Sequence, residues 1–158
     1  TEGLLLDKSI AENIEIANLK SVSKHGVLSK KKQEELVQQG IDEFKIKCFG
    51  PWHECNNLSG GNQQKVVLAK WIATNPKILI LDEPTRGVDI GAKKEIYNVI
   101  NKMAAQGVAV IMVSSELPEV LGMSDRIMVV REGEVRGILD GKDADQEKIM
   151  TLATGGTL

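Results

Sequence analysis

Apolar residues recur along the first half of the chain at the spacing of amphipathic helices. Ser9 and Glu12 have the spacing of a capping box, which predicts a helix that runs to about Leu19. A polar loop is expected over residues 20–28, followed by a second helix from Ser29 to Phe44. The face of this second helix that we expect to be buried holds Leu36, Val37, Ile41 and Phe44.

Strands and helices alternate in the second half. Ile78–Leu81 is an unbroken run of β-forming residues, which is typical of a fully buried parallel strand. Apolar residues at positions 96, 99, 100 and 103 then predict a helix that Asp89 caps and Gly107 ends. Val108–Val113 predicts a second buried strand, so the three elements should form a right-handed βαβ unit.

The C-terminal part predicts a short helix, a hairpin and a last helix. Ser114 or Ser115 is expected to cap the short helix, with Pro118 in its first turn. Residues 126–131 and 134–139, joined by Glu-Gly, have the pattern of a β-hairpin. The last helix should run over residues 145–153 and end at two glycines.

Two adjacent carboxylates, Asp82 and Glu83, directly follow the first predicted strand. Ligands of α/β sheets bind at the carboxyl ends of strands. Paired carboxylates there suit phosphoryl transfer, because one can help to hold Mg²⁺ while the next activates the attacking water. The pair alone is equally consistent with a strand followed by a polar turn.

The segment LSGGNQQK at 58–65 comes directly before an apolar run that predicts a mostly buried helix. Ser59, Gly60, Gly61 and Asn62 therefore form the N-terminus of that helix. Two glycines let the backbone approach an anion closely, and the free N–H groups and the helix dipole attract negative charge. The Ser59 hydroxyl can also donate to a phosphate oxygen. Taken alone, the SGG triplet favours a capped helix after a glycine turn.

Composition and charge exclude several classes of protein. The chain has 158 residues, 42% hydrophobic and 27% charged, as is typical of one compact globular domain. A formal net charge of −2 gives no general attraction to nucleic acid or anionic lipid. The apolar runs are too short to cross a bilayer, and the first residues lack the pattern of a signal peptide. We therefore expect a cytosolic protein without a nucleic-acid partner.

The only cysteines are Cys48 and Cys55, in the segment CFGPWHEC. Their spacing, with His53 and Glu54 between them, matches no usual zinc site. A loop with two reduced thiols is the favoured interpretation.

One expected motif is missing. A nucleoside-triphosphate site normally contains G-x-x-x-x-G-K-[ST], whose loop wraps the phosphates. The nearest match, GILDGKD at 137–143, has one residue too few between the glycines and follows a predicted hairpin strand, so we reject it. Because Thr1 is not an initiator methionine, we expect a piece of a longer polypeptide. Because the phosphate-binding loop is missing, we expect this piece by itself neither to bind ATP tightly nor to hydrolyse it.

LSGGNQQK, with ILILDEPT some twenty residues later, resembles the signature motif and Walker B segment of ATP-binding cassette (ABC) ATPases. NQQK, DEPTRGVDIGAK and VSSELPEVLGMSDRI look like the C-terminal half of the tandem ATP-binding subunit of bacterial monosaccharide importers of the ribose, xylose, arabinose or galactose type. The resemblance implies an α/β fold: a partial P-loop NTPase core with parallel strands, preceded by a helical subdomain and ending in a C-terminal β-hairpin. Residues 1–75 would form the helical subdomain, including the signature helix, and residues 76–158 would form the C-terminal part of the ATPase core.

The resemblance also implies roles for single residues. Asp82 would help to position Mg²⁺, and Glu83 would be the general base. The signature residues Ser59, Gly60, Gly61 and Asn62 would bind the ATP that a partner cassette holds. Asp89 falls on the D-loop, where GVD departs from the commoner S-x-L-D. Ser115 stands where most members carry a histidine that contacts the γ-phosphate, and this is the most serious departure.

A subunit of this kind would lie on the cytoplasmic face of the bacterial inner membrane. It would pair with a second cassette, dock on two membrane permease chains and be served by a periplasmic sugar-binding protein. Two other interpretations remain open. One is a non-hydrolytic half that lends its signature to the partner site, which Ser115 favours and Glu83 disfavours. The other is a DNA-repair or chromosome ATPase, which would need coiled-coil heptads before the signature and a basic surface, and neither is visible in the sequence.

Overall fold

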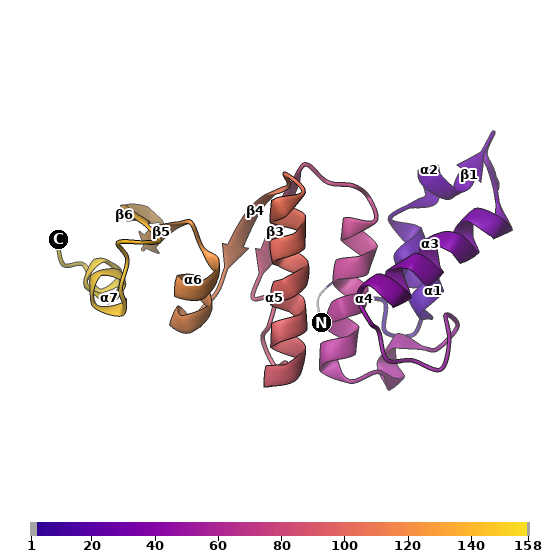
Figure 1. Cartoon of the computed structure of the whole chain (residues 1–158), viewed down its shortest axis with the longest axis horizontal. Coiled ribbons are helices and arrows are strands. Elements are labelled where there is room, and N and C mark those ends of the chain that lie inside the picture. The colour runs from indigo at the N-terminus through magenta and orange to yellow at the C-terminus, as the bar shows by residue number, and fades with distance from the viewer. Residues whose placement is uncertain (1–2, 158) are drawn as a thin grey trace. The chain divides into compact units, whose positions relative to one another are not determined.

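The computed structural model describes residues 3–157. The chain divides into two compact units, Thr1–Ile111 and Met112–Leu158. Figure 1 shows the order of helices and strands along the chain. No helix in the part of the chain that the structure describes is long and apolar enough to cross a membrane. The subdomain boundary after residue 75 stays a prediction.

The first part of the first unit contains four helices and a small hairpin. They are α1 (Ile10–Ile16), α2 (Leu19–Val22), β1 (Ser23–Lys24), β2 (Val27–Leu28), α3 (Lys30–Glu43) and α4 (Gly60–Ile72). Helices α1, α3 and α4 pack against one another (Figure 1). Their buried side chains include Ile10, Ile14, Val37, Val66 and Leu68.

The capping box at the start of α1 is confirmed. The Glu12 N–H donates to Ser9 Oγ (3.2 Å), and the Ser9 N–H donates to Glu12 Oε2 (2.8 Å). The predicted end at Leu19 is wrong, because α1 ends at Ile16. The Asn18 side chain donates to the carbonyl of Ile14 (2.8 Å), the acceptor that a further helical turn would use.

The predicted polar loop over 20–28 is also corrected. Helix α2 takes up its start, and β1 and β2 pair antiparallel, Ser23 opposite Leu28. The two residues that join them, His25 and Gly26, both have positive φ (51° and 81°). Tight hairpin turns favour this backbone geometry because its twist matches that of the strands. His25 is exposed.

Helix α3 begins and ends as predicted, with Ser29 and Phe44 as its caps. Val37 and Phe44 are buried, whereas Leu36 and Ile41 are half-buried. Gly40 lets α1 approach closely, since a Cβ there would lie 3.1 Å from Ile14 Cδ1.

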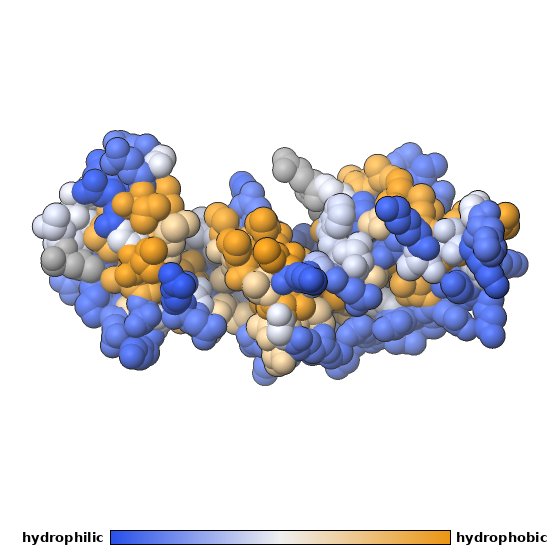
Figure 2. Space-filling model, turned by 90° about the horizontal axis from the view of Figure 1, so that it is seen from above, coloured by the Kyte–Doolittle hydropathy of each residue, from blue (hydrophilic) through white to orange (hydrophobic). Residues whose placement is uncertain are grey.

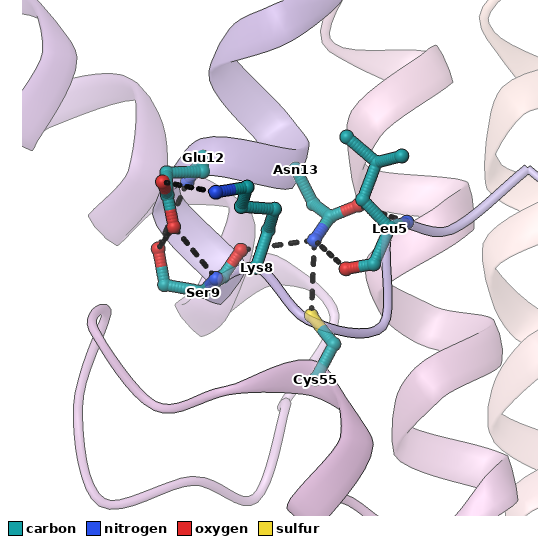
Figure 3. A network of polar contacts seen from close by, with 6 residues as sticks. All are labelled: Leu5, Lys8, Ser9, Glu12, Asn13 and Cys55. Atoms are coloured by element: carbon teal, nitrogen blue, oxygen red, sulfur yellow. Dashed lines mark hydrogen bonds and ion pairs between the residues drawn. The ribbon is translucent and has the colours of Figure 1, made fainter.

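A buried asparagine ties the first loop of the described chain to α1 and to the segment before α4 (Figure 3). Asn13 is fully buried, and its Nδ2 donates to the carbonyls of Leu5 (2.8 Å) and Ser9 (3.0 Å). The same group contacts Cys55 Sγ at 3.3 Å. Both cysteines are free, and burial raises the pKa of Cys55 to about 11. The network therefore uses Cys55 as a neutral acceptor.

The predicted strand–helix–strand sequence follows α4, and its last strand crosses the boundary between the two units. It consists of β3 (Ile78–Asp82), α5 (Ile90–Ala105) and β4 (Ala109–Val113). The strands β3 and β4 are parallel neighbours in one sheet. The Ile96, Ile100 and Met103 side chains of α5 are buried, as its spacing predicted, and Gly107 follows its end with φ 90°.

The prediction that both strands are fully buried is wrong. Leu79 and Leu81 are buried, but Ile78 and Ile80 are 60% and 67% exposed. Val113 of β4 is exposed as well. Successive side chains of a strand point to opposite faces, so the described residues cover only one face of β3. Apolar residues gather at the surface over this sheet (Figure 2).

The second unit consists of α6 (Leu117–Met123), β5 (Arg126–Arg131), β6 (Glu134–Asp140) and α7 (Gln146–Thr154). The predicted hairpin is confirmed, with Ile127 opposite Leu139. Helix α7 packs on the hairpin and buries Ile149 and Leu152 against Ile127 and Val129.

The start of α6 differs from the prediction. Its N-cap is Glu116, so neither Ser114 nor Ser115 caps it. The Ser114 hydroxyl instead accepts the Glu116 N–H (3.0 Å) in the turn before the helix. Pro118 lies in the first turn, as predicted, because its missing N–H is not needed there.

Candidate functional site

The signature residues lie at the exposed start of α4. Ser59 is the N-cap but its side chain makes no capping hydrogen bond. Its Oγ instead accepts from Asn62 Nδ2 at 2.9 Å, which leaves the hydroxyl proton able to donate to a ligand. The first intrahelical hydrogen bond runs from the Gln63 N–H to the Ser59 carbonyl (2.9 Å). The preceding N–H groups therefore form the positive end of a 13-residue helix, which suits an anion.

The two glycines bring this helix start against the loop before α5. A Cβ on Gly61 would lie 2.9 Å from Ala92 Cβ, closer than side chains normally pack, and 3.5 Å from Val88 Cγ1. A Cβ on Gly60 would lie 3.7 Å from the Gly87 carbonyl oxygen. Gly61 is therefore required for packing within this chain, in addition to any approach of a phosphate.

Asp89 lies in the same place. Its Oδ1 accepts the Ala92 N–H at 3.0 Å and caps α5, as predicted. Its Oδ2 is 3.8 Å from where a Cβ on Gly61 would stand. The structure thus brings Asp89 together with the signature residues, which the sequence pattern did not indicate.

The two carboxylates follow one another at the carboxyl end of β3. Asp82 is the last strand residue and is exposed, and Glu83 is half-buried. Glu83 has φ 49°, a left-handed conformation that is uncommon for residues other than glycine. Pro84 and Thr85 are buried directly behind it, and the Arg86 N–H donates to the Glu83 carbonyl (3.1 Å). The turn therefore holds Glu83 between the strand and a buried anchor.

Asp82 fits a Mg²⁺ ion that is shared with a triphosphate. Among residues 3–157, no three His, Cys, Asp or Glu side chains cluster as an enclosed metal site. Mg²⁺ is commonly held by one or two carboxylates, with water and substrate phosphates completing its octahedron. An exposed carboxylate at the end of a strand can supply such a ligand.

Ser115 lies in the second unit, exposed in the short link between β4 and α6. Its neighbour Ser114 makes the hydrogen bond that shapes this link.

Two residues of the site region were missed by the sequence analysis. Lys65 ends the signature segment but is only 4% exposed, and its ammonium pairs with Glu95 of α5. The hydrogen bond from Lys65 lowers the pKa of the Glu95 carboxyl. The available signal was the position of Lys65, directly before the apolar residues of a helix predicted to be mostly buried.

Comparison with protein families matches residues 2–86 to the family described as ABC transporter, which is more than half of the chain. The chain belongs to the ABC transporter family. The resemblance drawn from LSGGNQQK and ILILDEPT is therefore confirmed, and membership implies the use of ATP.

Individual relatives of this ABC family chain agree. It is 59% identical over 155 residues to the ribose import ATP-binding protein RbsA of Bacillus subtilis, an alignment that covers 98% of this chain and 31% of that protein. The protein of the same name from Streptococcus agalactiae is also 59% identical, with 98% and 32% covered. The chain thus spans about a third of the length of these relatives.

A solved structure supports the predicted α/β cassette fold. It is a dimeric ATP-binding cassette described as a post-hydrolysis state bound to ADP and Pi. It is 24% identical, has a TM-score of 0.76, and is matched over 89% of this chain and 60% of its own. At this identity the comparison shows the fold alone.

Proposed function

We propose that this chain is part of the ATP-hydrolysing subunit of an ABC importer, where it couples hydrolysis to the uptake of a monosaccharide. The identity of 59% to ribose import proteins over almost the whole chain supports a sugar of this kind. The subunit would lie on the cytoplasmic face of the inner membrane, bind two permease chains and work with a periplasmic sugar-binding protein.

The observation that carries the enzymatic part is the adjacency of Asp82 and Glu83 at the carboxyl end of β3. Asp82 would coordinate Mg²⁺, which supplies charge neutralisation at the phosphates when it is bound. Glu83 would accept the proton of the attacking water. Its fixed backbone turn supports this role, because a base must be held within hydrogen-bond reach of its water.

The start of α4 would serve a different site. Ser59, Gly60, Gly61 and Asn62 would contact the γ-phosphate of ATP bound to a second cassette, either the other half of the same subunit or a dimer partner. The exposed helix start and the available Ser59 hydroxyl support this assignment. Asp89, which lies beside Gly61, would face the same partner through the D-loop.

One departure supports a second candidate function. Ser115 occupies the position where the family pattern has histidine, and serine is shorter and carries no positive charge. This half could then act as a non-hydrolytic element that lends its signature to the partner's site. Glu83, the retained base, is the reason to prefer the catalytic proposal.

Ser59→Arg in the full-length subunit tests the assignment. We expect it to abolish sugar-stimulated ATP hydrolysis by the reconstituted transporter, because a bulky cation at the start of α4 blocks the approach of the partner's nucleotide. Thr74→Arg, a change at another exposed position beyond the other end of α4, is the matched control and should leave the rate unchanged. Wild-type hydrolysis in Ser59→Arg would remove the signature assignment.

A further inference from the structure

Lys65 carries a charge that is almost completely removed from water. Its side chain is 5% exposed, and its Nζ contacts Glu95 Oε2 on α5. The same Nζ donates to the carbonyl of Lys45 (3.2 Å), in the turn that follows α3. A buried ammonium is costly unless it is paired and hydrogen-bonded, and removing one partner leaves the other charge uncompensated. One atom therefore links three segments that are far apart in sequence.

The segment that Lys65 anchors leads directly to the signature serine. Two residues after Lys45, the Lys47 N–H donates to Asn62 Oδ1 at 2.9 Å. Asn62 Nδ2 in turn donates to Ser59 Oγ at 2.9 Å. The orientation of the Ser59 hydroxyl thus depends on Asn62, and Asn62 depends on a backbone segment that Lys65 holds.

The other partner of Lys65 fixes the start of α5. Gly61 packs against Ala92, and Lys65 and Glu95 lie about one turn further along each helix. A single point of contact would allow α4 and α5 to pivot about it, whereas two points fix the angle between them. Nearby Lys45 and Lys47 also favour the charged form of Glu95, and together with Lys65 they keep its pKa low.

We propose that Lys65 is a positioning residue that holds the Ser59 hydroxyl and the Asp89-capped start of α5 as one surface. It touches no nucleotide, so its effect reaches the partner's ATP only through Ser59 and Asp89. This inference rests on the proposed function, in which that surface closes on a second cassette. Without Lys65, fewer molecules have the geometry that closure needs. The apparent affinity for ATP falls in proportion to the fraction of molecules in that geometry.

The test uses the full-length subunit, with Lys65→Met, Lys65→Arg and Glu95→Gln. Methionine keeps an unbranched chain without the charge, arginine keeps the charge, and glutamine removes the negative partner alone. Lys102→Met is the matched control. Lys102 pairs with Glu43 and so also joins α5 to α3, but neither residue contacts Lys65, Asn62 or Ser59 through the hydrogen bonds described above. The first readout is amide hydrogen exchange over residues 45–63 without nucleotide, and the second is KM for ATP against kcat.

We expect Lys65→Met to speed exchange over residues 45–63 by about tenfold, because local opening becomes easier when a fixed contact is lost. KM for ATP should rise by about tenfold while kcat at saturating ATP stays within about twofold of wild type. Glu95→Gln should shift both readouts in the same direction, Lys65→Arg should restore them, and Lys102→Met should change neither.

Several results would overturn the inference. They are unchanged exchange and KM in Lys65→Met, an equal effect in Lys102→Met, or no recovery with arginine. If Lys65→Met fails to fold, Glu95→Gln decides, since it removes one charge at a half-exposed position. A wild-type protein without ATPase activity would contradict the proposed function. Loss of activity in Ser59→Arg together with a normal KM in Lys65→Met would contradict this inference alone.

Discussion

Cys55 shows how burial changes the chemistry of one side chain. Its thiol is fully buried, and burial raises its pKa to about 11, whereas Cys48 is half-buried. Since the thiolate is the reactive form, iodoacetamide at pH 8 should label Cys48 at least ~100-fold faster than Cys55 in the folded protein. Peptide mass spectrometry over time measures both rates, and addition of urea should make them similar. Equal rates without urea would contradict the buried position of Cys55.

Gly61 gives a steric prediction at the same scale. Gly61→Ala places a methyl group 2.9 Å from Ala92 Cβ, so α4 and α5 must shift apart. We expect a loss of about 1–3 kcal/mol in the free energy of unfolding, the usual cost of overpacking. Adding Ala92→Gly removes the clash and should restore most of it. Denaturant titrations of the two variants and wild type measure this, and full stability of Gly61→Ala would refute the close contact.

Residues whose role depends on neighbouring positions were predictable from the sequence. The cap at Asp89 and the place of Ser59 at a helix start follow from residue type and spacing within one turn. Lys65 and Asn13 were not predictable in this way. Their burial depends on contacts with distant segments, which join residues up to 42 positions apart.

At the scale of elements, the pattern predicted the positions of the helices and strands in the second half better than it predicted which of their faces are buried. β3, α5, the β5–β6 hairpin and α7 occur where expected. The apolar run ILIL indicated burial on both faces, but such a run cannot say which elements cover each face. Helix ends were also misjudged where a side chain competes with the backbone, as Asn18 does at the end of α1.

The start of α7 allows a prediction about pH. Asp145 Oδ1 accepts the Lys148 N–H (2.8 Å), and this hydrogen bond lowers the pKa of the Asp145 carboxyl in the folded protein. As pH falls, the unfolded chain takes up the proton first, so the stabilisation is complete above the ordinary aspartate range and is lost below it. Asp145→Asn should keep the cap near pH 7 and lose this part of the acid dependence, and Asp145→Ala should destabilise α7 at both pH values. Thermal unfolding of each variant at pH 7 and pH 3 measures the loss of stability in acid. If Asp145→Asn and wild type lose the same stability, Asp145 is not the cause of this acid dependence.

At the scale of the whole molecule, the family and fold were predictable because two short motifs at a fixed separation are specific for ABC cassettes. The motifs also named the residues that the structure places at the start of α4 and at the end of β3. The spacing of the motifs did not predict that the glycines at the start of α4 pack against the loop before α5. This contact arises only when α4 and α5 come together.

The central claim is that this half of the subunit hydrolyses ATP with Glu83 as the base. The most direct measurement is ATP hydrolysis in the full-length subunit whose other site has been disabled. Glu83→Gln should keep ATP binding, since its shape is almost unchanged, and should lower the rate about 10²- to 10⁴-fold, the usual cost of removing a general base. Glu132→Gln is the control, because Glu132 has a similar left-handed backbone (φ 51°) in the β5–β6 turn and should not affect the rate.

The same assay tests the effect of Ser115. Under the proposed assignment, Ser115 would hold the γ-phosphate and water less firmly than histidine, because serine is shorter and carries no positive charge. This site should then turn over slowly in wild type, and Ser115→His should raise the rate if its loop leaves room for the ring. The decisive comparison is still wild type against Glu83→Gln. A loss of at least about 100-fold with ATP binding intact is the result we predict. An unchanged rate would contradict the catalytic account and favour a half that only lends its signature to the partner's site.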